Sequence, residues 1–122
     1  MERIAINVLA IRDNEILLVK KNETWILPGG KPMEGESEMD CLQREIKEEL
    51  PLVEVSNIRY FNDFVGITPH KGDMLRAKVY WGDVKGEIKP NAEINSAQWV
   101  KREKMEEYAL SDITQKIVNA LK

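Results

Sequence analysis

Residues 27–51 read LPGGKPMEGESEMDCLQREIKEELP, in which a Pro-Gly-Gly turn precedes a strongly acidic segment that ends on a proline. At about 100° per residue, the apolar side chains after Ser37 share one stripe of a helix: Met39, Leu42, Ile46 and Leu50. Ser37 is a suitable N-cap, with Asp40 three residues on as an approximate capping box. Pro51 cannot donate a backbone hydrogen bond, so we expect the helix to end at Leu50.

The arc beside the apolar stripe carries charged side chains: Arg44, Glu45, Glu48 and Glu49. Carboxylates three and four residues apart meet on one helix face, where they repel one another and raise one another's pKa values. A hard divalent cation, which prefers oxygen ligands, removes this repulsion. From charge alone, a merely solvated face is the commoner explanation, because acidic helix faces are frequent.

The spacing of the whole stretch resembles the motif of the Nudix hydrolase family. That motif reads Gly, five residues, Glu, seven residues, Arg-Glu, an aliphatic residue, any residue, Glu-Glu, any residue, Gly and a second aliphatic residue. Residues 30–52 match every specified position except the last glycine, which is Pro51. The preceding WILPGG also resembles the family's approach to the motif. Proline can stop a helix but cannot adopt the left-handed turn that glycine often supplies there, so we expect a different exit path.

The resemblance implies an α+β fold, an α/β/α sandwich with a mixed β-sheet, formed by one domain over residues 1–122 with a loop–helix–loop motif at 30–52. It also implies hydrolysis of a nucleoside diphosphate derivative with Mg²⁺ or Mn²⁺ as the cofactor. Carried over by position, the metal ligands are the side chains of Glu45, Glu48 and Glu49 and the backbone carbonyl of Gly30.

The resemblance assigns further roles around these ligands. Arg44 would orient a carboxylate, and Glu36 would support the geometry of the loop and helix. The general base would be Glu45 or a glutamate from a later loop. Residues 90–100, PNAEINSAQWV, resemble the family segment that supplies such a glutamate, which makes Glu93 the candidate. An ordinary exposed loop glutamate is an equal alternative for Glu93.

The substrate is less defined by the sequence. The resemblance puts first a nucleoside triphosphate, oxidised or not, cleaved to the monophosphate and pyrophosphate. ADP-ribose or another nucleotide sugar comes next, and a diadenosine polyphosphate last. Arg76 and Lys78 share one face of a predicted strand and, with Lys31, are the candidates for phosphate contacts. One or two aromatic side chains are expected to line a base pocket, chosen from Trp25, Tyr60, Phe61, Phe64, Tyr80 and Trp81.

Two alternatives from other classes stay open. A Nudix-fold nucleotide-binding or regulatory protein with little hydrolysis is favoured slightly by Pro51 and opposed by the intact glutamate set. A structural domain with an acidic face would not respond to Mg²⁺. A Cys–His mechanism is disfavoured, because Cys41 is expected to be a packing residue of the helix and His70, the only histidine, lies in a turn-like loop.

Local patterns predict the remaining elements. Residues 4–11 and 16–20 are expected to form a β-hairpin around Asp13 and Asn14, followed by a loop up to Ser37. Later strands are expected at residues 52–55, 58–66, 74–84 and 97–101. In the strand at 74–84, apolar and polar side chains alternate. A final helix is expected from Ser111, its N-cap.

Composition limits the class of protein. The chain has 122 residues and a formal net charge of −3, so it has no overall positive electrostatic field that would attract a nucleic acid polymer or an anionic membrane. Cys41 is the only cysteine, so an intramolecular disulfide is excluded and a reducing, cytoplasmic setting is expected. No apolar run is long enough to span a membrane, and the N-terminus does not resemble a signal peptide. The sequence leaves monomer and homodimer open.

Overall fold

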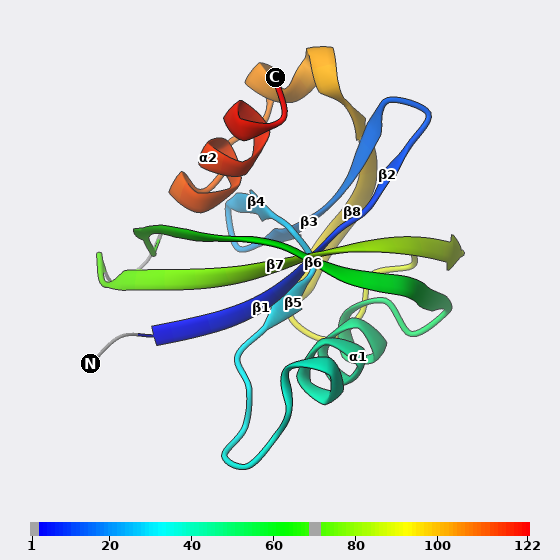
Figure 1. Cartoon of the computed structure of the whole chain (residues 1–122). Coiled ribbons are helices and arrows are strands. Elements are labelled where there is room, and N and C mark those ends of the chain that lie inside the picture. The colour runs from blue at the N-terminus through cyan, green and yellow to red at the C-terminus, as the bar shows by residue number, and fades with distance from the viewer. Residues whose placement is uncertain (1–2, 69–71) are drawn as a thin grey trace.

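The computed structural model describes residues 3–68 and 72–122, and within them the chain forms two four-stranded sheets between helices (Figure 1). The first sheet has the order β5-β1-β7-β6, and in the second β3 pairs with β2, β4 and β8. β1 and β7 are parallel while the other pairs in the first sheet are antiparallel, so the predicted mixed sheet is confirmed. The strands are β1 (Arg3–Leu9), β2 (Ile11–Arg12), β3 (Glu15–Lys21), β4 (Thr24–Ile26), β5 (Gly29–Gly30), β6 (Val53–Ile67), β7 (Met74–Gly86) and β8 (Ile94–Lys101).

Helices cover the two sides of the first sheet (Figure 1). Helix α1 (Glu38–Glu49) lies on one side, and α2 (Asp112–Ala120) lies on the other, after the short 3-10 helix η1 (Arg102–Glu107). Because side chains alternate along β1, this strand contributes to two core clusters: Ile6 and Val8 pack with α1, whereas Leu9 packs in the cluster that includes α2. No helix of the described residues is long and apolar enough to cross a membrane.

The predicted hairpin is correct at its turn and wrong in its extent. Asp13 and Asn14 have φ values of 49° and 66°, the left-handed conformations that a tight hairpin turn requires. Of the first predicted run, only the β2 part pairs with β3, because the chain crosses between the sheets near Ala10 and β1 pairs with β5 and β7 instead. Side chains of both apolar runs are buried in both core clusters, so their pattern alone does not identify the partner strand.

Other boundaries also differ from expectation. The predicted loop before Ser37 contains the short strands β4 and β5, and β8 begins three residues early. The two segments predicted at 52–55 and 58–66 are one strand, β6, interrupted in register around Asn57, whose φ is 53°. The strand β7 and the C-terminal helix are confirmed, with Ser111 Oγ accepting a hydrogen bond from the Thr114 N–H at 3.1 Å.

The buried stripe of α1 differs at three positions from the predicted one. Ser37 caps the helix by accepting from the Asp40 N–H at 3.1 Å, as expected. Met39 is 36% exposed, while Cys41 is fully buried and Glu49 is 3% exposed. The cause is the position of β5, which packs against α1 and turns the covered arc of the helix toward Glu49. Burial of Cys41 in the core cluster confirms that it is a packing residue of the helix.

Candidate active site

Two glycines allow the sheet to approach the acidic helix closely. A Cβ atom on Gly30 would lie 2.3 Å from Glu45 Cδ, and one on Gly29 would lie 2.0 Å from the Ile6 carbonyl oxygen. Gly29 also has a φ of 143°, which other residues rarely adopt. The Pro-Gly-Gly turn therefore places two backbone units directly against Glu45 and Glu49.

The three predicted ligand carboxylates have different environments. Glu49 is buried and its Oε1 accepts a hydrogen bond from the Gly29 N–H at 3.1 Å. Burial raises the pKa of Glu49 to about 8, because an ionised carboxylate loses hydration there. Burial also raises the pKa of Glu45, against the lowering effect of Arg44. The Glu48 side chain is 53% exposed.

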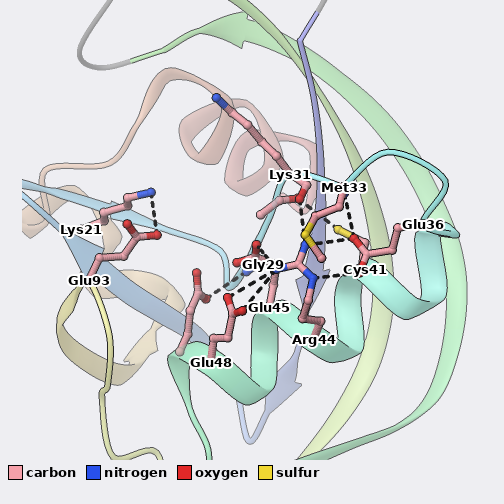
Figure 2. A network of polar contacts seen from close by, with 12 residues as sticks. Lys21, Gly29, Lys31, Met33, Glu36, Cys41, Arg44, Glu45, Glu48 and Glu93 are labelled. Carbon is pink, nitrogen blue, oxygen red and sulfur yellow. Dashed lines mark hydrogen bonds and ion pairs between the residues drawn. The ribbon is translucent and has the colours of Figure 1, made fainter.

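Arg44 joins the helix to the preceding loop (Figure 2). Its guanidinium donates to both oxygens of Glu36, at 2.8 and 2.9 Å, and to Glu45 Oε1 at 2.9 Å. It also donates to the Lys31 carbonyl at 3.0 Å and lies 3.4 Å from Glu48. The hydrogen bond from Arg44, with that from the Met33 N–H, lowers the pKa of Glu36 to about 2. The loop that carries Lys31 is thereby held on α1.

The donor groups fit a hard divalent cation. The carboxylates of Glu45, Glu48 and Glu49 and the Gly30 carbonyl all offer oxygen atoms. Because Gly30 has no side chain, there is space for Glu45 beside it. Within residues 3–68 and 72–122, no three acidic, histidine or cysteine side chains already converge on a point where a metal would be held. Arg44 and the Gly29 N–H each engage one oxygen only, Oε1 of Glu45 and Oε1 of Glu49, and the carboxylates must shift to converge on a cation.

The end of α1 explains how the helix terminates without the motif's glycine. Leu50 is the C-cap with φ −135°, and Pro51 has no left-handed conformation to adopt. The orphan carbonyls are satisfied from a distant loop, where Asn91 donates its backbone N–H to Glu49 O at 2.9 Å and its side-chain Nδ2 to Glu48 O at 3.1 Å. These contacts bring the loop that carries Glu93 to the acidic helix.

Glu93 lies at the edge of a cavity of about 310 Å³ that begins at the acidic site. Its carboxylate pairs with Lys21 Nζ at 3.1 Å (Figure 2) and remains 60% exposed. Around the same opening lie Gly30, Lys31 and Glu45. The structure therefore places four sequence-predicted residues, Gly30, Lys31, Glu45 and Glu93, around one opening.

The inner part of the cavity is walled by small and aliphatic side chains of the first sheet and of α2: Ala5, Leu75, Ala77, Ile113 and Ile117. Arg76 and Lys78 are not among the described residues that line it. Strand alternation turns them to the opposite face of β7, where Lys78 pairs with Glu38 at 2.9 Å and Arg76 with Asp63 at 3.4 Å.

No aromatic ring of the described residues lines the cavity, so the expectation of an aromatic base platform stays a prediction. Trp25 packs edge-on against Tyr108, and Tyr60 packs against Tyr80 on the α1 side of the sheet. The Phe61 ring contacts Phe64 and Trp81. These rings are therefore occupied in packing.

Sequence reasoning missed two polar residues. Asn7 lines the cavity from β1, and Asn91 ties the Glu93 loop to α1. The signal for Asn7 is a lone amide inside the apolar run IAINVLAI. Asn91 has no local signal, because its partners on α1 are distant in the sequence.

Comparison with known proteins is consistent with this geometry. A model of the NUDIX domain matches residues 1–121, and the chain belongs to the NUDIX domain family. The predicted Nudix-type fold is thereby confirmed. The MutT NUDIX hydrolase from Burkholderia pseudomallei superimposes with a TM-score of 0.87 at 23% identity, with 100% of this chain and 99% of that one covered. The MutT protein from Methanosarcina mazei Go1 gives a TM-score of 0.81 at 22% identity, covering 98% and 91%.

Curated relatives match over a shorter part of their length. The NAD-capped RNA hydrolase NudC of Pseudomonas putida is 36% identical over 97 residues, and the one of Pseudomonas fluorescens is 37% identical over 97 residues. The matches cover 75% of this chain but only 34% of either relative, so the chain corresponds to about a third of those proteins.

Proposed function

We propose that the chain hydrolyses the diphosphate linkage of a nucleoside diphosphate derivative with Mg²⁺ or Mn²⁺. The first candidate substrate is a nucleoside triphosphate, cleaved to the monophosphate and pyrophosphate. The observation that carries this proposal is the position of Glu45 and Glu49, held against Gly29 and Gly30 where the cavity opens. A polyphosphate bound there would lie beside the oxygen donors with its organic part in the cavity.

Residues of this chain supply the remaining functions. When bound, Mg²⁺ or Mn²⁺ neutralises phosphate charge and acidifies a coordinated water. Glu45, Glu48, Glu49 and the Gly30 carbonyl would hold the cation, and Arg44 would keep the loop and helix in place. Lys21 and Lys31, at the cavity opening, would offset the charge of the polyphosphate.

In the proposed reaction, the water oxygen forms a bond to phosphorus as the bridging P–O bond breaks. A carboxylate, Glu93 or Glu45, takes the proton from the water, and the leaving phosphate carries the bond's electron pair away. No enzyme nucleophile is required. Cys41 is unsuited to that role, because burial raises its pKa to about 11. His70 lies outside the described residues.

A second candidate is an NAD-type dinucleotide, favoured by the names of the curated relatives, which are NAD-capped RNA hydrolases. ADP-ribose, other nucleotide sugars and diadenosine polyphosphates follow in order. The cavity of about 310 Å³ lies at the small end of ligand sites and suits one nucleoside better than two. A cytoplasmic location, favoured by the lone buried thiol of Cys41, belongs to the same proposal.

The test is a panel of nucleotides assayed with Mg²⁺ and Mn²⁺, with products identified by mass spectrometry. Monophosphate and pyrophosphate identify the first candidate, whereas AMP and nicotinamide mononucleotide identify the second. Glu48→Gln should lower turnover by more than about 100-fold, since even outer partners of a metal site cost about 10–100-fold. The matched control is Glu54→Gln, at an exposed glutamate of β6. Tight binding of a nucleotide without turnover would favour the regulatory alternative.

A further inference from the structure

Asn7 is a polar residue on an otherwise apolar strand face. In β1, Ala5, Asn7 and Leu9 point to the side of the sheet that α2 covers, and Ala5 and Leu9 are buried. Asn7 lines the cavity between the metal-site opening and α2. An amide at this position must have its hydrogen-bonding groups satisfied by protein, solvent or ligand.

The orientation of the Asn7 carboxamide is determined by its surroundings. Its side-chain nitrogen donates to the carbonyl oxygens of Leu27, at 3.0 Å, and Pro28, at 3.4 Å. Because both partners can only accept, the amide cannot be turned round. Gly29 leaves room for this arrangement, since a Cβ there would lie 2.8 Å from Asn7 Nδ2. The group that remains is Oδ1, a pure acceptor, to which no other residue that the structure describes donates.

Other polar groups in the inner cavity are already paired with one another. The hydroxyls of Ser111 and Thr114 lie 2.7 Å apart, and Ser111 Oγ also accepts from the Thr114 N–H. The walls around them are aliphatic. Asn7 Oδ1 is therefore an acceptor that this part of the cavity offers to a ligand.

We propose that Asn7 is a specificity-determining residue, whose Oδ1 accepts a hydrogen bond from an N–H group on the part of the substrate that enters the cavity. The proposal rests on the proposed function, because it concerns the organic group attached to the hydrolysed diphosphate. A substrate without that donor leaves Oδ1 desolvated and unpaired, which lowers kcat/KM by about 10-fold or more. An aliphatic wall cannot provide such discrimination.

A competing role for Asn7 is to position the loop before Gly29, through the two carbonyls to which its nitrogen donates. The two roles predict different kinetics. A positioning role affects every substrate equally and lowers kcat, whereas a specificity role changes the ratio between substrates that differ by one donor.

The experiment compares pairs of ribonucleoside triphosphates that differ by one exocyclic amino group: ATP with purine riboside triphosphate, GTP with ITP, and CTP with the triphosphate of its 4-deamino analogue. For the wild type we expect the amino-bearing member of at least one pair to have about 10-fold higher kcat/KM. Asn7→Leu should bring that ratio to within about 2-fold of one. Asn7→Ala, which only removes atoms, repeats the test if leucine perturbs β1. Thr114→Val, on the same cavity wall, should keep the wild-type ratio.

Two results would overturn the proposal: equal kcat/KM within all three wild-type pairs, or an unchanged ratio in the Asn7 variants with kcat lowered for every substrate. Calorimetric binding of the same pairs in Ca²⁺ gives the ratio of Kd values independently of turnover. Binding with the amino preference but without hydrolysis would contradict the proposed function and support Asn7. Hydrolysis without any amino preference would support the function and contradict Asn7.

Discussion

The substitution Glu49→Gln separates two effects of the buried carboxylate: the stability that its burial costs the fold, and the stabilisation that it provides by binding a cation. In the wild type, Glu49 is 3% exposed and its partner for hydrogen bonding is the Gly29 N–H, which Gln can equally satisfy through its carbonyl oxygen. The substitution keeps the size of the side chain and removes the ionisable group. Without metal it should stabilise the fold, whereas with Mg²⁺ it should abolish the stabilisation that the cation gives the wild type.

The magnitude follows from the pKa of Glu49, about 8 in the folded chain against an ordinary value of 4.5. The folded state then binds more protons than the unfolded state between these values, so stability falls as pH rises from about 4.5 to about 8. At pH 7 the ionisation penalty is about 3 kcal/mol. Glu49→Gln escapes it, and we expect a gain of about 1–3 kcal/mol in EDTA, or a rise in Tm of about 4–12 °C.

The assay is thermal unfolding of wild type and variant at pH 5 and pH 8, each in EDTA and in Mg²⁺. In EDTA the wild type should lose stability relative to Glu49→Gln as pH rises. Glu48→Gln is the matched control, because its half-exposed carboxylate should change stability by less than about 0.5 kcal/mol. A Glu49→Gln protein less stable than the wild type at pH 8 in EDTA would refute the assignment of a buried, metal-dependent charge.

Three further substitutions test the frame of the site. Asn91→Ala removes the side-chain donor to Glu48 O, which should lower the free energy of unfolding in urea by about 1 kcal/mol. It should also lower kcat more than it changes KM, because the loop that carries Glu93 is then less firmly held on α1. An effect confined to KM would contradict this. Pro51→Gly should cost about 0.4–1 kcal/mol by loosening the unfolded chain and leave kcat unchanged, whereas increased activity would show that the motif's glycine matters. Arg44→Lys should lower Tm by about 4 °C and reduce kcat, because lysine cannot donate to both oxygens of Glu36 at once. Retained activity would refute the role of these two hydrogen bonds.

Short-range patterns in the sequence were sufficient for several elements. The cap at Ser37, the alternation of β7 and the register from Gly30 to Glu49 depend on neighbours within a few turns or residues. For this reason the helix and its spaced acids could be predicted without a structure.

Features that depend on distant partners could not be predicted in this way. The first apolar run reads like half of a hairpin, but its partner β7 lies some 70 residues away. The side of β7 that meets the cavity depends on where α2 packs, so the sequence alone does not show that Arg76 and Lys78 face away from the cavity. Glu49 reads as a surface acid until β5 covers it. Asn91 and Glu48 meet 43 residues apart, and their contact replaces the glycine turn.

A crystal structure of the wild type with Mn²⁺, with an anomalous difference map that locates the metal, tests directly whether the acidic helix binds a cation. We expect an anomalous peak coordinated by carboxylates of Glu45, Glu48 and Glu49 and by the Gly30 carbonyl. Glu49→Gln crystals treated identically should lack that peak. A peak at other residues, or none at these carboxylates at saturating Mn²⁺, would contradict metal binding at this site.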